Sequence, residues 1–257
     1  MSSPNLIKHE QFASRYLRNQ RDLIVYLPPS YGAQPQRHFP VLYLHDGQNL
    51  FDGATSFIPG MDWHIGQTAD QWIQEGRVEP IIIVGIYNAG KQRIREYTPT
   101  RAPKLGGGSA NRYAKFLLEE VRPFINMAYR ALDGSENTGI GGSSLGGLVS
   151  LYVGLRQPQI FGKIAALSPS VWWNERVILR FAAAAPVQPL PRIWLDIGTR
   201  EGPRIVDDVE RFRDILIRKG WQPDRDLHYQ RVEGAEHNEA AWAQRVGPFL
   251  RFLFPVR

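Results

Sequence analysis

The stretch from 139 to 147, GIGGSSLGG, constrains the fold of this chain more than any other segment. It sets two adjacent serines among five glycines. Glycine is favoured where the backbone needs a positive φ or where another backbone comes very close. An apolar, strand-like run leads into the stretch, and an apolar pattern with helical spacing follows at 145–156. The segment therefore predicts a tight strand-turn-helix junction.

Apolar runs and helical patterns alternate along most of the chain. The runs PVLYL at 40–44 and PIIIVGI at 80–86 are almost wholly apolar, which is typical of strands covered on both faces of a parallel sheet. Further strands are predicted at 22–27, 137–142, 163–168, 192–197 and 227–233, and helices at 66–76, 110–130, 145–156, 203–219 and 239–254. The alternation predicts an α/β fold with a doubly wound, mostly parallel sheet of about eight strands, whose site lies at the strands' carboxyl ends.

Length and composition limit the classes of protein that fit. With 257 residues, of which 43% are hydrophobic, the chain can bury one sizeable core, and we expect a single domain over 1–257. It has no apolar run long enough to span a membrane and no secretory signal at its start, so we expect a cytoplasmic protein without a membrane partner. The absence of cysteine excludes disulfides and thiolate metal sites.

The net charge of +6 invites a nucleic-acid hypothesis, but the distribution of charge argues against it. The basic residues are mostly arginines interleaved with acids, as in DDVERFRDILIRK at 207–219, which is typical of a solvated helix face. No basic run of the kind that follows phosphates is present. We therefore expect no nucleic-acid partner, while the oligomeric state is left open.

The glycine spacing distinguishes the two serines. In the motif G-x-S-x-G, a sharp turn exposes the serine hydroxyl, and the outer positions are small because strand and helix crowd there. A frame centred on Ser144 has Gly142 and Gly146 at those positions, whereas a frame centred on Ser143 ends on Leu145. Ser144 is the predicted nucleophile. An ordinary turn or a phosphate-binding loop is the alternative, although no lysine stands where a P-loop would place one.

A serine nucleophile needs a histidine base and an acid that holds the base. In this type of strand-turn-helix site, the chain order is serine, acid, histidine. His228 lies inside a predicted strand, whereas His237 follows it in the polar loop EGAEHNEA, so His237 is the predicted base. The acid is expected just after the strand at 192–197. Glu201 is preferred, and the alternatives are Asp196 within that strand and, on the outer helix, Asp207 and Asp208.

Cleavage of an ester also needs backbone donors for the oxyanion. The N–H of Leu145, directly after the nucleophile, is one, and the turn LHDGQNLFD at 44–52 should supply the other. Gly47 permits a close backbone approach there, which makes the Gln48 N–H the expected second donor. His45, Asp46 and Asp52 in the same turn suggest a metal site, but mixed spacing without further ligands favours hydrogen-bonded turn residues, and we expect no metal.

Six blocks, taken in order, carry a resemblance: YLHDGQNLFD, GIYNAGKQRIREYTP, IGGSSLGGLVSLY, FGKIAALSPSVWW, WLDIGTREG and GAEHNEAAW. They resemble the esterase D-like putative esterase family of α/β-hydrolases, which includes enterochelin esterases, feruloyl and acetyl-xylan esterase domains and mycolyltransferases. The likeness runs from about residue 20 to 254. It implies an α/β-hydrolase fold with Ser144, Glu201 and His237 as the catalytic triad, and with Gln48 and Leu145 forming the oxyanion hole.

The resemblance also implies a substrate side. It adds Arg93 and Arg95, with Glu96 and Tyr97, on the loop after the strand at 80–86, and Trp172 and Trp173 after SPS. The arginines are expected either to meet an anionic or phenolic substrate or to pair with Glu96, and the tryptophans are equally consistent with core anchors.

These observations together predict a serine carboxylic-ester hydrolase that acts on a small-molecule ester through an acyl-enzyme and needs no cofactor. An acyltransferase that passes the acyl group to an alcohol or sugar is one alternative. A catalytically silent family member acting as a binding protein is the other, and the intact serine, histidine and oxyanion turn argue against it.

Overall fold

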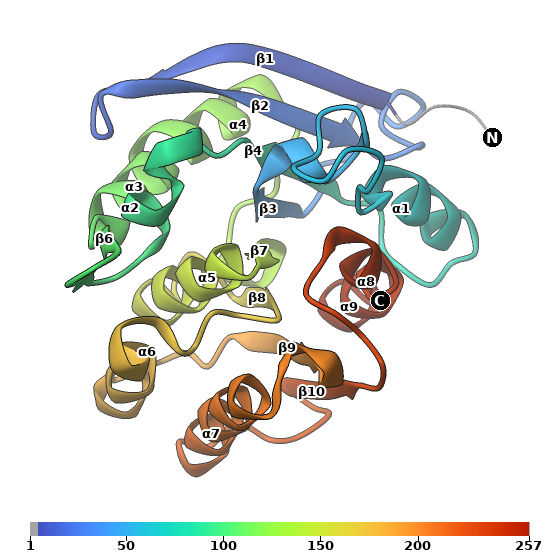
Figure 1. The fold of residues 1–257 in the computed structure, drawn as a ribbon. Coiled ribbons are helices and arrows are strands. Elements are labelled where there is room, and N and C mark those ends of the chain that lie inside the picture. Colours follow the sequence, from blue (N-terminus) through green and yellow to red (C-terminus); the bar gives the residue numbers. More distant parts are fainter. Residues whose placement is uncertain (1–4, 257) are drawn as a thin grey trace.

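A computed structural model describes residues 5–256 of the chain (Figure 1). Its centre is an eight-stranded sheet with the strand order β1-β2-β4-β3-β7-β8-β9-β10. β1 and β4 each pair with β2 in antiparallel fashion, and the other neighbouring strands are parallel. The strands of this sheet are β1 (Asn5–Ser14), β2 (Asn19–Leu27), β3 (Val41–His45), β4 (Ile82–Ile86), β7 (Thr138–Ser143), β8 (Lys163–Leu167), β9 (Arg192–Gly198) and β10 (Leu227–Val232). A small hairpin joins β5 (Arg101–Ala102) to β6 (Gly106–Gly107).

Helices cover both faces of the sheet (Figure 1). One face carries α2 (Arg93–Tyr97), α3 (Ala110–Phe116), α4 (Arg122–Ala128), α5 (Leu145–Arg156), α6 (Trp173–Ala184) and α7 (Pro203–Arg218). The other face carries α1 (Ile65–Gln74), α8 (Glu239–Ala243) and α9 (Val246–Leu253). Within residues 5–256, none of these helices is both long and apolar enough to cross a membrane.

The central strands are buried on both faces, as their apolar runs predict. Val41 and Tyr43 of β3 point into the hydrophobic cluster beneath α3 and α5, while Leu42 and Leu44 point into the cluster beneath α1 and α9. Successive side chains of a strand face opposite ways, so a continuous apolar run fills two cores at once. The α/β fold with eight strands is confirmed.

Several elements differ from the prediction. The expected helix over 110–130 consists of α3, a π-helical turn over Leu117–Val121 and α4, because Pro123 has no N–H with which to continue the α-helical pattern. The expected helix over 239–254 breaks between α8 and α9, where Pro248 cannot donate to the carbonyl of Gln244. β1 was not predicted, because this edge strand is mostly exposed and lacks a strong apolar pattern. α2, α6 and the hairpin of β5 and β6 were not predicted either.

Candidate active site

The strand-turn-helix junction lies between β7 and α5, with Ser144 at its tip. Ser144 has φ 57° and ψ −122°, a conformation that a residue with a side chain rarely adopts. A Cβ added to Gly142 would lie 3.0 Å from the carbonyl carbon of Gly146. Glycine is therefore required by close packing at Gly142, one of the outer positions of the frame centred on Ser144.

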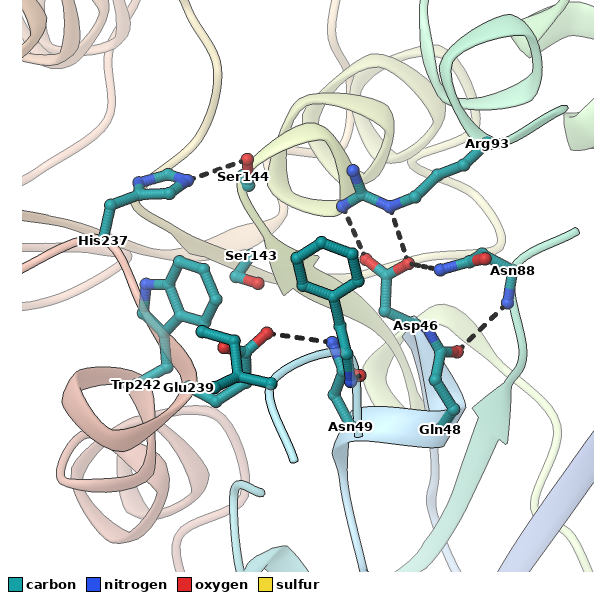
Figure 2. Close-up of a pocket in the computed structure, with 12 residues that line it drawn as sticks. Asp46, Gln48, Asn49, Asn88, Arg93, Ser143, Ser144, His237, Glu239 and Trp242 are labelled. Atoms are coloured by element: carbon teal, nitrogen blue, oxygen red, sulfur yellow. Dashed lines mark hydrogen bonds and ion pairs between the residues drawn. The ribbon is translucent and has the colours of Figure 1, made fainter. Parts of the chain in front are cut away.

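The side chains of Ser144, His237 and Glu201 form one chain of hydrogen bonds. His237 Nε2 lies 2.9 Å from Ser144 Oγ, a contact marked by a dashed line in Figure 2. His237 Nδ1 lies 2.6 Å from Glu201 Oε2. Glu201 ends the 3₁₀ turn after β9, and His237 lies on the loop between β10 and α8. Segments far apart in the sequence thus bring an acid, a base and a hydroxyl into line at the carboxyl end of the sheet.

Glu201 is held as an ionised acceptor. Its Oε1 accepts hydrogen bonds from Ser168 Oγ at 2.6 Å and from the Gly198 N–H at 2.9 Å. Burial by itself would raise the pKa of Glu201, but the hydrogen bonds from His237, Ser168 and Gly198 outweigh it and hold the pKa below its ordinary value. A carboxylate in this state can orient the imidazole and stabilise it when it becomes positively charged.

The alternative acids have other partners. Asp196 is fully buried and accepts hydrogen bonds from Arg245 Nη1 at 2.6 Å and Trp194 Nε1 at 2.7 Å. Burial raises the pKa of Asp196 above its ordinary value, although Arg245 opposes the shift. On α7, Asp207 is exposed and Asp208 pairs with Arg176. Of the acids considered, Glu201 is the one that contacts His237.

The turn after β3 lies beside Ser144. Asp46 has φ 57°, and Gly47–Asn49 forms a 3₁₀ turn. A Cβ on Gly47 would lie 2.6 Å from the carbonyl carbon of Gly85 in β4, so the close approach expected at this glycine is an approach to the neighbouring strand. Leu145 is the first residue of α5, and the N–H of a first helical residue has no acceptor within its helix.

A pocket of about 200 Å³ opens over Ser144 (Figure 2). It brings together the turn after β3, the loop that carries His237 and the segment after β4. Its lining residues are Asp46, Gln48, Asn49, Phe57, Ile58, Asn88, Arg93, Ser143, Ser144, His237, Glu239 and Trp242.

Arg93 is neutralised within this pocket. Its Nε and Nη2 donate to the two carboxylate oxygens of Asp46 at 2.7 and 2.8 Å, and Asn88 Nδ2 donates to the same carboxylate at 2.7 Å (Figure 2). Burial would raise the pKa of Asp46, but Arg93 outweighs it and keeps the pKa low. The arginine that pairs with Glu96 is Arg21, so the expected pairing of Arg93 or Arg95 with Glu96 is wrong.

The other residues expected on the substrate side lie elsewhere. Arg95 is exposed, and its Nε lies 3.4 Å from Ser109 Oγ. Trp172 is 40% exposed, whereas Trp173 is buried and donates from Nε1 to the Thr100 carbonyl. None of these three is among the described residues that line the pocket, so their role in binding substrate remains a prediction that this geometry does not support.

The turn at 44–52 uses its polar side chains for hydrogen bonds. His45 is fully buried, with Nδ1 2.9 Å from Tyr113 Oη, and burial lowers its pKa to about 3. Asp46 is paired with Arg93, as described above, and Asp52 Oδ1 accepts from the Ala54 N–H at 2.8 Å. Within residues 5–256, no group of three or more His, Cys, Asp or Glu side chains is arranged to hold a metal ion.

Three polar residues that organise this site, Ser168, Asn49 and Glu239, were not predicted from the sequence. Ser168 connects Glu201 to Trp242, whose Nε1 donates to Ser168 Oγ at 3.1 Å. Asn49 Nδ2 donates to Glu239 Oε1 at 3.1 Å, which connects the turn after β3 to α8. In the sequence, Asn49 follows Gln48, Glu239 lies two residues after His237, and Ser168 begins the motif SPS. None of these positions identifies a hydrogen-bond partner.

Comparisons with known proteins show the family and the fold of the chain. The family model described as putative esterase matches residues 14–253. The uncharacterized protein YbbA of Bacillus subtilis is 26% identical over 94% of this chain and 95% of its own length. Ferri-bacillibactin esterase BesA of Bacillus subtilis is 32% identical over 57% of this chain and 53% of its own length. The structure of the BES protein from Bacillus cereus covers 100% of this chain and 97% of that chain at a TM-score of 0.78 and 20% identity, a likeness that shows the fold.

Proposed function

Because the chain belongs to the putative esterase family, we propose that it is a serine carboxylic-ester hydrolase with a Ser144, His237 and Glu201 triad. Family membership and the esterase relatives support ester hydrolysis. The observation that carries the residue roles is the unbroken chain of hydrogen bonds from Ser144 Oγ through both ring nitrogens of His237 to Glu201. This is the arrangement that activates a serine hydroxyl at neutral pH.

The first half of the reaction forms an acyl-enzyme. His237 Nε2 takes the proton from Ser144 Oγ as the oxygen attacks the carbonyl carbon of the ester. The negative charge that develops on the carbonyl oxygen is stabilised by the N–H groups of Gln48 and Leu145, while Glu201 stabilises the imidazolium. The tetrahedral intermediate then collapses, and His237 gives the proton to the departing alcohol oxygen.

The second half releases the acid. A water molecule takes the place of the alcohol, and His237 removes its proton as the oxygen attacks the acyl carbon. Collapse of this second intermediate returns the proton to Ser144 Oγ and frees the carboxylic acid. If an alcohol or sugar attacks instead of water, the same steps give acyl transfer.

A panel of 4-nitrophenyl esters of different acyl lengths tests the proposal. We expect Ser144→Ala to lower kcat by at least about 10⁴-fold, because the nucleophile is removed. Ser143→Ala is the matched variant, since it deletes the neighbouring hydroxyl, which is not a partner of His237 in the described chain, and we expect turnover to stay within about tenfold of wild type. Wild-type rates in Ser144→Ala would refute the proposal.

Covalent labelling provides an independent test. A fluorophosphonate should form an adduct on Ser144, located by mass spectrometry of the digested protein, and the Ser144→Ala variant should remain unlabelled. The absence of both labelling and turnover would instead indicate a silent binding protein. Measuring the products with and without a competing alcohol distinguishes hydrolysis from acyl transfer.

A further inference from the structure

Glu239 is a buried acid in the pocket that the proposed chemistry does not use. It begins α8, two residues after His237, and only 4% of its surface is exposed. It lines the pocket together with Ser144, and Figure 2 shows it on the wall formed with Asn49 and Trp242. An acidic side chain kept in this position is costly, since burial disfavours its charge.

The side chain that hydrogen-bonds to Glu239 carries no charge. Asn49 Nδ2 donates to Glu239 Oε1 at 3.1 Å, and an amide carries no net charge. The Asn49 side chain is itself fixed, because its Oδ1 accepts from the Phe57 N–H at 2.9 Å. The carboxylate is thus held in one orientation by a neutral donor.

Among the described residues that line the pocket, no positively charged side chain forms an ion pair with this acid. Among the described residues that line it, Arg93 is the one with a permanent positive charge, and both carboxylate oxygens of Asp46 already accept from it. The imidazole of His237 is occupied between Ser144 and Glu201. A negatively charged group entering the pocket would meet Glu239 in a partly desolvated space, where like charges repel more strongly than in water.

We propose that Glu239 is a specificity-determining residue whose carboxylate makes the pocket reject ester substrates that carry a negative charge and favour their neutral counterparts. The proposal deepens the esterase function and rests on it. It replaces the expectation that Arg93 selects anionic substrates, because that guanidinium is committed to Asp46.

Two pairs of matched esters test this selectivity. The first pair is the mono-4-nitrophenyl ester of adipic acid and that of its monoamide, which differ in charge but hardly in shape on the acyl side. The second pair is the acetate ester of 4-hydroxybenzoic acid and that of 4-hydroxybenzamide, which place the same difference on the alcohol side. The quantity measured is kcat/KM for the amide divided by kcat/KM for the carboxylate, at pH 8 and with spontaneous hydrolysis subtracted.

We expect the wild type to favour the amide by at least about tenfold in one pair or both, and Glu239→Gln to reduce that ratio by about tenfold. Gln keeps an oxygen that can accept from Asn49, so this variant removes the charge and retains the hydrogen bond. Glu236→Gln is the matched control: it removes a charge next to His237 from a residue outside the pocket lining, and its ratio should stay within twofold of wild type.

Several outcomes would overturn the proposal. A wild type that cleaves carboxylate and amide equally well in both pairs refutes it without any variant, as does an unchanged ratio in folded Glu239→Gln. If the amide-to-carboxylate ratio of kcat/KM changes equally in the Glu236→Gln and Glu239→Gln variants, the effect arises from the electrostatic field of the whole protein and not from Glu239. If the wild type cleaves none of the four esters in a Ser144-dependent manner, the esterase function itself fails, which is a distinguishable result.

Discussion

Asp196 and Glu201 lie at the carboxyl end of the same strand, yet their surroundings differ. Asp196 is fully buried against Arg245, a cation that does not lose its proton. Glu201 contacts His237, whose side chain is 43% exposed and whose other ring nitrogen reaches Ser144. The partner therefore distinguishes the two acids. Asp196 forms an ion pair with a permanent cation, which stabilises the fold, whereas Glu201 pairs with an imidazole, which can transfer a proton.

Ser168 connects the two regions. Its N–H donates to Asp196 Oδ1 at 3.0 Å, and its hydroxyl donates to Glu201 Oε1 at 2.6 Å. Arg245 Nη1 also donates to Ser168 Oγ at 3.0 Å. The ion pair can thus stiffen the segment that orients Glu201, although it takes no part in the proposed chemistry.

The sharpest test of this difference is Glu201→Gln. We expect kcat to fall on the order of 10³-fold to 10⁴-fold, because a neutral amide no longer stabilises the imidazolium. Circular dichroism and thermal unfolding should show a folded protein. Activity close to wild type would mean that Glu201 is not the catalytic acid.

Asp196→Asn should produce the opposite pattern. The variant leaves Arg245 buried without a negative partner, so we expect the free energy of unfolding to fall by about 3 kcal/mol. Denaturant titration measures this loss. The kcat per folded molecule should change far less than in Glu201→Gln, and an equally large loss of kcat would remove the distinction between the two acids.

A smaller effect is expected in the free energy of unfolding at acidic pH. The folded state holds the pKa of Glu201 below its ordinary value of 4.5, so the stability that this carboxylate contributes is present above that pH and is lost as pH falls through the folded-state value. Glu201→Gln should therefore lose less stability than the wild type as the pH is lowered below about 4.5. Urea titrations of both proteins at pH 7 and pH 4 measure the difference, and parallel profiles would argue against it.

The smallest effect is expected from Glu236→Gln. Glu236 lies next to His237 in the sequence, but it is 58% exposed and pairs with Arg200 at 3.6 Å. We expect the free energy of unfolding to change by no more than about 0.5 kcal/mol, as for other exposed ion pairs, and kcat to stay within twofold. A large effect here would show that charge near the histidine matters even without burial.

Much of the site could be predicted from the sequence because its determinants are local. The glycines around Ser144 fix a turn between an apolar strand and a helix, and parallel strands bring their carboxyl ends to one edge of the sheet. Those two facts, with the polar loop that holds His237, were enough to select Ser144, His237 and Glu201, which the structure brings into contact.

The partners of the charged residues depended on the tertiary structure. Asn49 and Glu239 are 190 residues apart in the chain, and Asp46 and Arg93 are 47 apart. No local pattern states which acid meets which donor, because such pairs form only when separate loops converge above the sheet. The sequence by itself thus determined the fold class and the order of the proposed catalytic groups, whereas the folded chain decided that Arg93 pairs with Asp46 and that Glu239 faces the pocket with the neutral Asn49 as its hydrogen-bond partner.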